Sequence, residues 1–269
     1  MIGIIALLIA ILLPSLMRAR EAAQTTQCLS NLRQVMAAAN MYSIENKGWM
    51  LPSQTPNGSW WTNLLVDSGS LTAPKSTSSS KILTNGVFFC PSGNRDQLAG
   101  VWVSLPNNHT QPTSRVDEDN SMPTRHTSGA TGVALYNWYG INAAASSNPR
   151  TSPIKGHPVR DDPAPTATSP GPFVHQKMTT VKLASEMVMF YDGVTYHLDV
   201  NPNRLSARHN RKTATNLAFF DGHCQTFPTK DLPGGLYASW VASPGGVFEI
   251  NSLRNEPAGR PKWILDQQY

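Results

Sequence analysis

The chain begins with an uninterrupted apolar run. From Ile2 to Leu13 no side chain is charged or polar, so a helix formed here has no face for water and must be buried in lipid or protein. Such a helix rises about 18 Å, against about 30 Å of bilayer hydrocarbon, and continuation to Met17 still gives a marginal span. The pattern predicts a membrane anchor or an assembly helix, and the short span favours a start inside a longer apolar segment.

After Pro14 the pattern becomes amphipathic and remains helical. Apolar residues recur at spacings of three and four, which predicts one buried face. These positions are Cys28, Leu32, Val35, Ala39 and Tyr42. Polar residues fall outside this face, namely Gln24, Asn31, Gln34 and Lys47. Because Gly48 is a good helix stop, we expect one helix from Ile2 to about Asn46, roughly 68 Å long.

Short apolar segments bounded by turn formers predict a β-rich remainder. A short helix is expected around Trp61 to Asp67. The expected strands are Gly86 to Phe89, Val101 to Leu105, Val133 to Ile141, Leu236 to Val241 and Val247 to Ile250. The tail that contains Trp263 is expected to pack back onto the sheet.

Two apolar segments near the C-terminus end in Asp-Gly. Glu186 to Asp192 precedes Gly193, and a second apolar run precedes Asp221-Gly222. An Asp-Gly pair between two apolar runs is a strong signal for a two-residue hairpin turn. We therefore expect paired strands at Thr215 to Phe220 and His223 to Phe227.

The pattern also sets a domain division. Residues 1–48 form the N-terminal helix, and residues 49–269 form a globular head. Two long segments of the head, about 106–132 and 148–172, have no strand pattern, and the second contains seven prolines. We expect both to be irregular surface insertions.

A resemblance to a known family is found at several places. Residues 2–34 read IGIIALLIAILLPSLMRAREAAQTTQCLSNLRQ, which resembles the N-terminal helix of type IV pilin-like proteins and type II secretion pseudopilins. Cys90 to Ser92, Tyr139 to Asn142, and His209 followed by Asp221-Gly222 are similar to signatures of the planctomycete-type group of these proteins. The interval from His209 to Asp221 is longer than usual there. In the family a basic leader, a cleavage site and a Phe-Thr-Leu-Ile-Glu-like segment precede this helix, so we expect such a segment upstream of Met1.

The resemblance implies an α+β fold of the pilin type, in which a long N-terminal helix packs on an antiparallel sheet and the head has long loops. It implies a structural subunit, not an enzyme, in a type IV pilus-like filament or a secretion pseudopilus. The expected partners are copies of the chain or other pilin-like subunits, the membrane through residues 2–17, and the assembly machinery. The head would be extracytoplasmic and the helix would lie in the inner membrane. The assembly residues would be Ile2, Ile4, Ile5, Leu7, Leu8, Ile9, Ile11, Leu12, Leu13 and Pro14.

Three residues near the expected strand ends could hold a cation. Asp192, Asp221 and His209 would suit calcium, which prefers oxygen ligands. The other interpretation is that both Asp-Gly pairs are turns and His209 is a packing or hydrogen-bonding residue. No other cofactor is predicted. No catalytic residue is predicted either, because the sequence has no Gly-x-Ser-x-Gly, His-Glu-x-x-His or phosphate-binding motif.

Composition agrees with a loop-rich extracytoplasmic body. Charged residues make up 14% of the chain, where about 25% is usual, and there are 21 prolines and 19 glycines. The net charge of +5 is spread along the chain without a basic cluster. Nucleic acid is therefore not expected as a partner.

The sequence has three cysteines, Cys28, Cys90 and Cys224. They are too few for a disulfide scaffold and lack the paired spacing of a zinc site. A bridge between Cys28 and Cys90 would tie the helix to the head, whereas the alternative is three small buried hydrophobic residues. The spacing alone does not choose between these interpretations.

A second class of function also fits the pattern. Residues 2–17 could merely anchor an extracytoplasmic glycan-binding protein or hydrolase, with sugars stacked on some of the seven tryptophans. Tryptophans more often fill a core or line an interface. The filament subunit is therefore the leading hypothesis.

Overall fold

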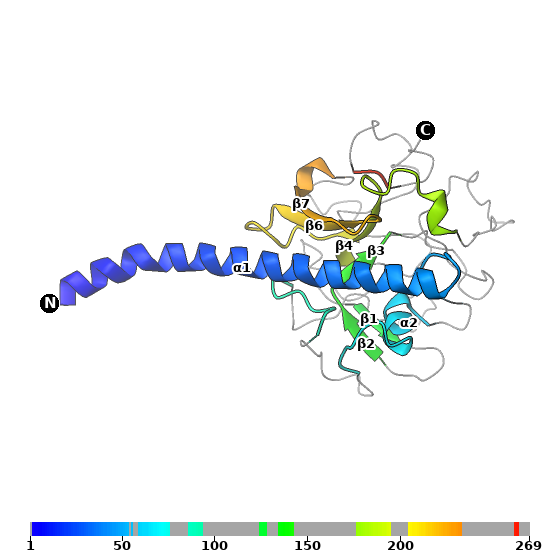
Figure 1. Cartoon of the computed structure of the whole chain (residues 1–269). Coiled ribbons are helices and arrows are strands. Elements are labelled where there is room, and N and C mark those ends of the chain that lie inside the picture. The colour runs from blue at the N-terminus through cyan, green and yellow to red at the C-terminus, as the bar shows by residue number, and fades with distance from the viewer. Residues whose placement is uncertain are drawn as a thin grey trace, which may run out of the picture.

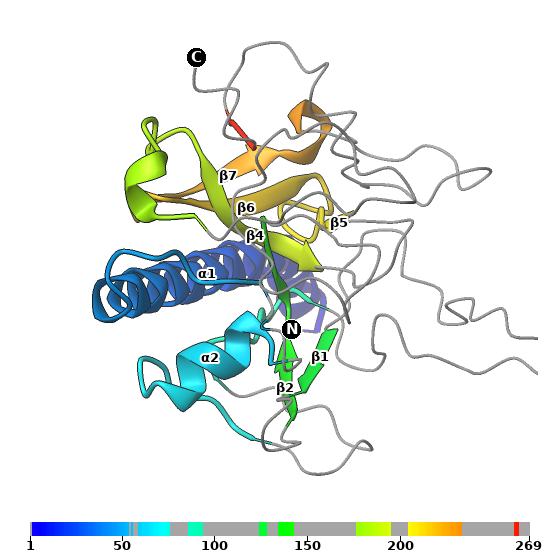
Figure 2. The same ribbon diagram turned by 90° about the vertical axis from the view of Figure 1, so that its right-hand side faces the viewer.

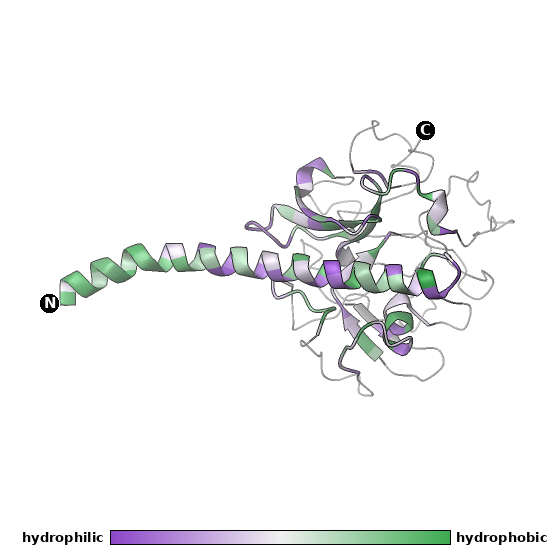
Figure 3. Ribbon diagram, viewed as in Figure 1, coloured by the Kyte–Doolittle hydropathy of each residue, from purple (hydrophilic) through white to green (hydrophobic). Residues whose placement is uncertain are grey.

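A single long helix, α1 (Ile2–Glu45), dominates the computed structural model (Figure 1). The structure describes residues 2–53, 55, 59–75, 86–93, 124–127, 134–142, 176–194, 204–232 and 261–263. The first half of α1 projects away from the head, and the second half lies against it. Figure 3 shows that the projecting half is the hydrophobic one. By length and composition this helix is able to cross a membrane, and the predicted helix is confirmed.

The head end of α1 stops where the sequence predicts. Lys47 and Gly48 both have a positive φ, of 56° and 81°. The Gly48 N–H donates to the Ser43 carbonyl at 2.8 Å, which closes the last turn and satisfies a carbonyl left over at the helix end.

The main sheet is antiparallel, with the strand order β3 (Tyr139–Ile141), β4 (Val188–Val194), β6 (Ala214–Phe219), β7 (Cys224–Pro228). A short strand, β5 (Arg204–Leu205), pairs with the end of β4. The smaller elements are α2 (Trp61–Asp67), a ribbon of β1 (Thr124–Thr127) and β2 (Ala134–Asn137), and 3-10 turns at η1 (Met178–Thr180) and η2 (Thr229–Asp231). The α+β class is therefore confirmed.

Alternation along β6 explains how the sheet is covered on both faces. Ala218, together with Phe220 just after the strand, belongs to the core cluster that includes Cys28, Leu32 and Val35 of α1. Leu217 and Phe219 belong to a second cluster on the other face, which includes Trp263. The expected return of the Trp263 segment onto the sheet is confirmed. Figures 1 and 2 show α1 running between the main sheet and the part formed by α2, β1 and β2.

Asn31 of α1 lies inside the head, although the pattern placed it outside the buried face. Asn31 is only 8% exposed, and its amide donates to the Phe89 carbonyl at 2.7 Å. The hydrogen bond satisfies the amide, so its burial is tolerated. Tyr42, expected in the buried face, is half-buried.

The segment Val133 to Ile141, expected as one strand, is interrupted at Trp138. β2 belongs to the small ribbon and β3 to the main sheet. The Asn137 side chain makes hydrogen bonds with both the N–H and the carbonyl of Tyr139, which competes with strand pairing at this point. In β3, Gly140 lies against the ring of Tyr191, where an added Cβ would be 2.1 Å from a ring carbon. Only glycine fits there.

Three other strand predictions need correction. Gly86 to Phe89 is a turn segment, since Phe89 N–H donates to the Gly86 carbonyl. β1 lies within the insertion that was expected to be irregular. The β6–β7 connection has three residues, not two, because Phe219 pairs with His223 and Gly222 has a φ of 96°. Val101 to Leu105, Leu236 to Val241, Val247 to Ile250 and 148–172 lie outside the described residues.

Candidate functional site

A buried aspartate–histidine pair lies where α1 meets the main sheet. Asp192 of β4 and His209, which follows β5, have an Oδ2 to Nε2 distance of 2.9 Å, and both side chains are 0% exposed. Asp192 Oδ2 also accepts from the Asn216 N–H of β6 at 2.8 Å. The strand β4 continues through Gly193 because that residue pairs with Leu205 of β5. Asp192-Gly193 is therefore not a turn, and the strand directs the carboxylate into the protein.

The second ring nitrogen of His209 faces α1. Its Nδ1 lies 3.2 Å from Thr25 Oγ1, and the Thr25 hydroxyl donates its own proton to the Glu21 carbonyl at 3.0 Å. The threonine oxygen can therefore only accept from Nδ1, so Nδ1 bears a proton. Nε2 faces the Asp192 carboxylate.

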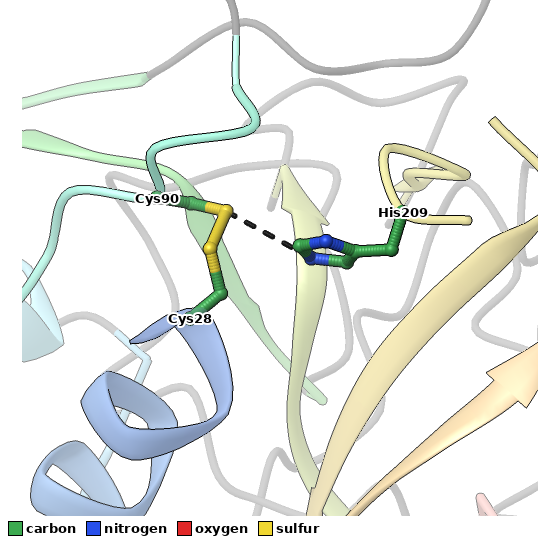
Figure 4. Close-up of side chains that lie close together, drawn as sticks. All are labelled: Cys28, Cys90 and His209. Atoms are coloured by element: carbon green, nitrogen blue, oxygen red, sulfur yellow. Dashed lines mark hydrogen bonds between the residues drawn. A yellow bond between two sulfur atoms is a disulfide. The ribbon is translucent and has the colours of Figure 1, made fainter. Parts of the chain in front are cut away.

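A disulfide lies directly beside this pair. Cys28 of α1 is bonded to Cys90, with the two Cα atoms 5.1 Å apart. The Cys90 Sγ is 3.8 Å from His209 Nε2 (Figure 4). The sulfur atoms and a histidine nitrogen all lie within 4.8 Å of one another, and all three residues are buried. This bridge is the pair considered in the sequence, and it ties α1 to the head.

The Asp192–His209 pair leaves one buried atom unsatisfied. Asp192 Oδ1 has no hydrogen-bond partner in the described part of the chain. An unmatched carboxylate oxygen in a dry interior is costly.

The candidate cation site of Asp192, His209 and Asp221 is not assembled as a trio. Asp221 is at the β6–β7 turn and pairs with His223 Nδ1 at 2.6 Å. The neighbouring Phe220 N–H donates to the carbonyl of Met187, at the opposite end of β4 from Asp192. At about 3.3 Å per residue, Met187 and Asp192 are about 17 Å apart along the strand, so the structure does not bring the side chains of Asp221 and Asp192 together.

The third cysteine, Cys224, is a free thiol. Burial raises the pKa of Cys224 to about 11, with the Asp192 and Asp221 carboxylates adding to the shift and Arg33 opposing it. Little thiolate is present at neutral pH, and thiolate is the reactive form. Cys224 is therefore a poor nucleophile toward the neighbouring bridge.

Two contributors to the site were missed in the sequence, Thr25 and Asn216. Thr25 lies three residues before Cys28, so both point to one face of α1, and this spacing could have been read from the sequence. The Asn216 backbone contact follows only from the pairing of β4 with β6.

Comparison with protein-family models, with curated proteins and with solved structures found no match to this chain. The resemblance described above therefore depends on the N-terminal helix and the short motifs. The structure adds a long apolar N-terminal helix followed by an antiparallel sheet.

Proposed function

We propose that this protein is a structural subunit of a type IV pilus-like filament or a type II secretion pseudopilus. The observation that supports this most directly is the unequal burial of α1. Cys28, Leu32, Val35, Met36 and Ala39 are 0% exposed, whereas every residue from Ile2 to Arg20 is exposed. One half of a continuous helix is thus built into the head, and the other half is left for lipid or for other copies.

The apolar half supplies a large driving force for association. Its exposed aliphatic residues include Ile2 at 86%, Leu7 at 64% and Ile11 at 66%. Burial of such a side chain contributes about 1.5–3 kcal/mol. In a filament the apolar half of one copy would pack against those of neighbours in a contact that does not close on itself, and such contacts extend into fibres.

The head fits an extracytoplasmic location. A disulfide between Cys28 and Cys90 is the kind of bond that persists in oxidising compartments. We propose that residues 2–17 lie in the inner membrane before assembly, that the head faces outward, and that pilus or secretion machinery moves the subunit between the two states. Within this proposal the role is structural and not catalytic.

Three of the five described tryptophans give no support to the glycan-binding alternative. Trp61, Trp138 and Trp263 are buried, and Trp61 packs on Phe190 with ring centroids 5.0 Å apart. These residues form core and not a platform for sugars. Trp102 and Trp240 lie outside the described residues.

The test uses the full chain in membranes, with chemical crosslinking and electron microscopy. Wild type should give a ladder of crosslinked species and filaments. The double variant Leu8→Ala and Leu12→Ala keeps the segment apolar but removes bulk from one helix face. The variant should remain in the membrane. The amount of crosslinked oligomer should fall at least tenfold, because the association free energy loses about 2 kcal/mol for each shortened side chain.

The matched control is Ile44→Ala, on the same helix at its head end, where the side chain is 79% exposed. It should assemble as wild type. Wild-type protein that stays monomeric in every membrane preparation, including one with pilus assembly machinery, would exclude the filament function.

A further inference from the structure

We propose that Cys28, Cys90, His209 and Asp192 form a zinc site whenever the two cysteines are not joined. These four residues come from separate parts of the chain: α1, the segment after Phe89, the segment after β5, and β4. All four are 0% exposed. Two thiolates, one imidazole and one carboxylate are ligands that Zn²⁺ accepts in closed four-coordinate sites.

The separations already match much of a tetrahedron. With Zn–S of about 2.3 Å and Zn–N or Zn–O of about 2.0–2.1 Å, ligand atoms lie about 3.6 Å apart for S and N and about 3.3 Å apart for N and O. The observed distances are 3.8 Å from Cys90 Sγ to His209 Nε2 and 2.9 Å from Nε2 to Asp192 Oδ2. The two sulfur atoms must separate to about 3.8 Å. The Asp192 carboxylate must also approach the cysteines, because only Cys28, Cys90 and His209 form the group whose ligand atoms all lie within 4.8 Å of one another.

The surroundings of His209 are those of a metal ligand. A ligating histidine typically donates its other ring N–H to an oxygen, which fixes the ring. Here Nδ1 donates to Thr25 Oγ1, whose hydroxyl is committed to Glu21. Nε2 is therefore the nitrogen that faces both Cys90 and Asp192, and Zn²⁺ would bind there. The unpartnered Asp192 Oδ1 provides a further carboxylate oxygen at the same place.

The two states of the site differ in protons and electrons. When Zn²⁺ binds the dithiol form, both thiol protons leave to solvent and the Nε2 lone pair binds the metal. A disulfide oxidant returns the site to the bridged state. Its S–S bond breaks as the Cys28–Cys90 bond forms. The oxidant receives the two electrons, takes up two protons from solvent to become a dithiol, and Zn²⁺ departs. The disulfide and the bound metal therefore cannot be present at the same time, because both use the sulfur atoms of Cys28 and Cys90.

The experiment uses the full chain in detergent micelles, reduced and free of metal under inert gas, and titrated with Co²⁺ as a spectroscopic probe for Zn²⁺. The reduced protein should bind one equivalent and show thiolate-to-cobalt charge transfer together with the visible bands of tetrahedral cobalt. Zn²⁺ should abolish both signals. The same protein with its disulfide intact should show neither.

Variants then assign the ligands. Cys90→Ser should abolish the charge-transfer band, and Asp192→Asn should weaken Co²⁺ binding by roughly ten- to a hundredfold. Cys224→Ser is the matched control, because it also leaves two thiols but should bind as wild type. If Cys90→Ser fails to fold, the comparison of reduced with oxidised wild type decides.

The proposal is overturned if reduced wild type keeps its circular dichroism spectrum but develops no charge-transfer band. It is equally overturned if the band persists in a folded Cys90→Ser variant or disappears in Cys224→Ser. None of these readouts involves filaments, so failure here leaves the proposed function untouched.

Discussion

At the scale of single residues, a few buried polar side chains hold separate segments of the head together. Asn142 donates to the carbonyls of Val188 and Trp263, at 2.9 and 2.8 Å. His126 Nδ1 forms a hydrogen bond with Thr62 Oγ1 at 2.8 Å. The His126 ring also stacks on Trp60, with ring centroids 4.5 Å apart. Each such residue joins elements that are distant in the sequence, so its loss should affect the head as a whole.

His126 should make the stability of the head depend on pH. Burial lowers the pKa of His126 from 6.5 to about 3, so the folded state excludes a proton that the unfolded chain binds. Stability is therefore complete above about pH 6.5 and falls as the pH decreases toward about 3, by up to about 1.4 kcal/mol per pH unit.

Denaturant unfolding of the full chain in micelles between pH 7 and 4 measures this slope. His126→Asn should flatten it. His223→Asn, which removes a half-exposed histidine, should keep the loss in acid. Equal slopes for wild type and His126→Asn would contradict the prediction.

At the scale of elements, the loop after His209 has three consecutive residues in the left-handed backbone conformation. Asn210, Arg211 and Lys212 have φ values of 47°, 56° and 63°, and a left-handed conformation costs about 1–2 kcal/mol for a residue with a Cβ. Backbone hydrogen bonds between His209 and Ala214 close the loop at 3.0 and 3.1 Å, and the Arg211 N–H donates to the Glu21 carboxylate. These contacts hold the loop against α1 and position His209.

Glycine should relieve this strain. Arg211→Gly is expected to be more stable than Arg211→Ala by about 1 kcal/mol, since both remove the side chain but only alanine keeps the Cβ. Thermal unfolding of the two variants measures the difference. A more stable alanine variant would show that the loop is not strained at this position.

The elements that could be predicted are those with a local cause. The helix follows from residues three and four apart, and the β6–β7 hairpin follows from Asp221-Gly222 between two apolar runs. The segment Gly86 to Phe89 has the composition of a strand but folds as a turn, which the Phe89 N–H closes by donating to the Gly86 carbonyl. Asp192 meets His209 only because β5 pairs with the end of β4 and the chain that follows folds onto α1. No local sequence pattern predicts such distant pairing.

At the scale of the whole molecule, the disulfide should be a main source of stability. It joins residues 62 positions apart, and in the chain-entropy description closure of such a loop contributes about 4 kcal/mol. The double variant Cys28→Ser and Cys90→Ser should lose roughly that amount.

The measurement is denaturant unfolding in micelles, followed by fluorescence of the buried tryptophans. Cys224→Ser should stay close to wild type. A loss below about 1 kcal/mol in the double variant would mean that packing alone fixes α1 to the head.

The position of the bridge also decides how mechanical force enters the protein. Cys28 lies about 16 Å along α1 from Met17 at about 1.5 Å per residue, close to where the helix first becomes buried. Tension applied to the N-terminal half therefore acts on the Cys28–Cys90 disulfide before it can separate Leu32 and Val35 from the sheet. Tension on the N-terminal half of α1 would move the head as one rigid body.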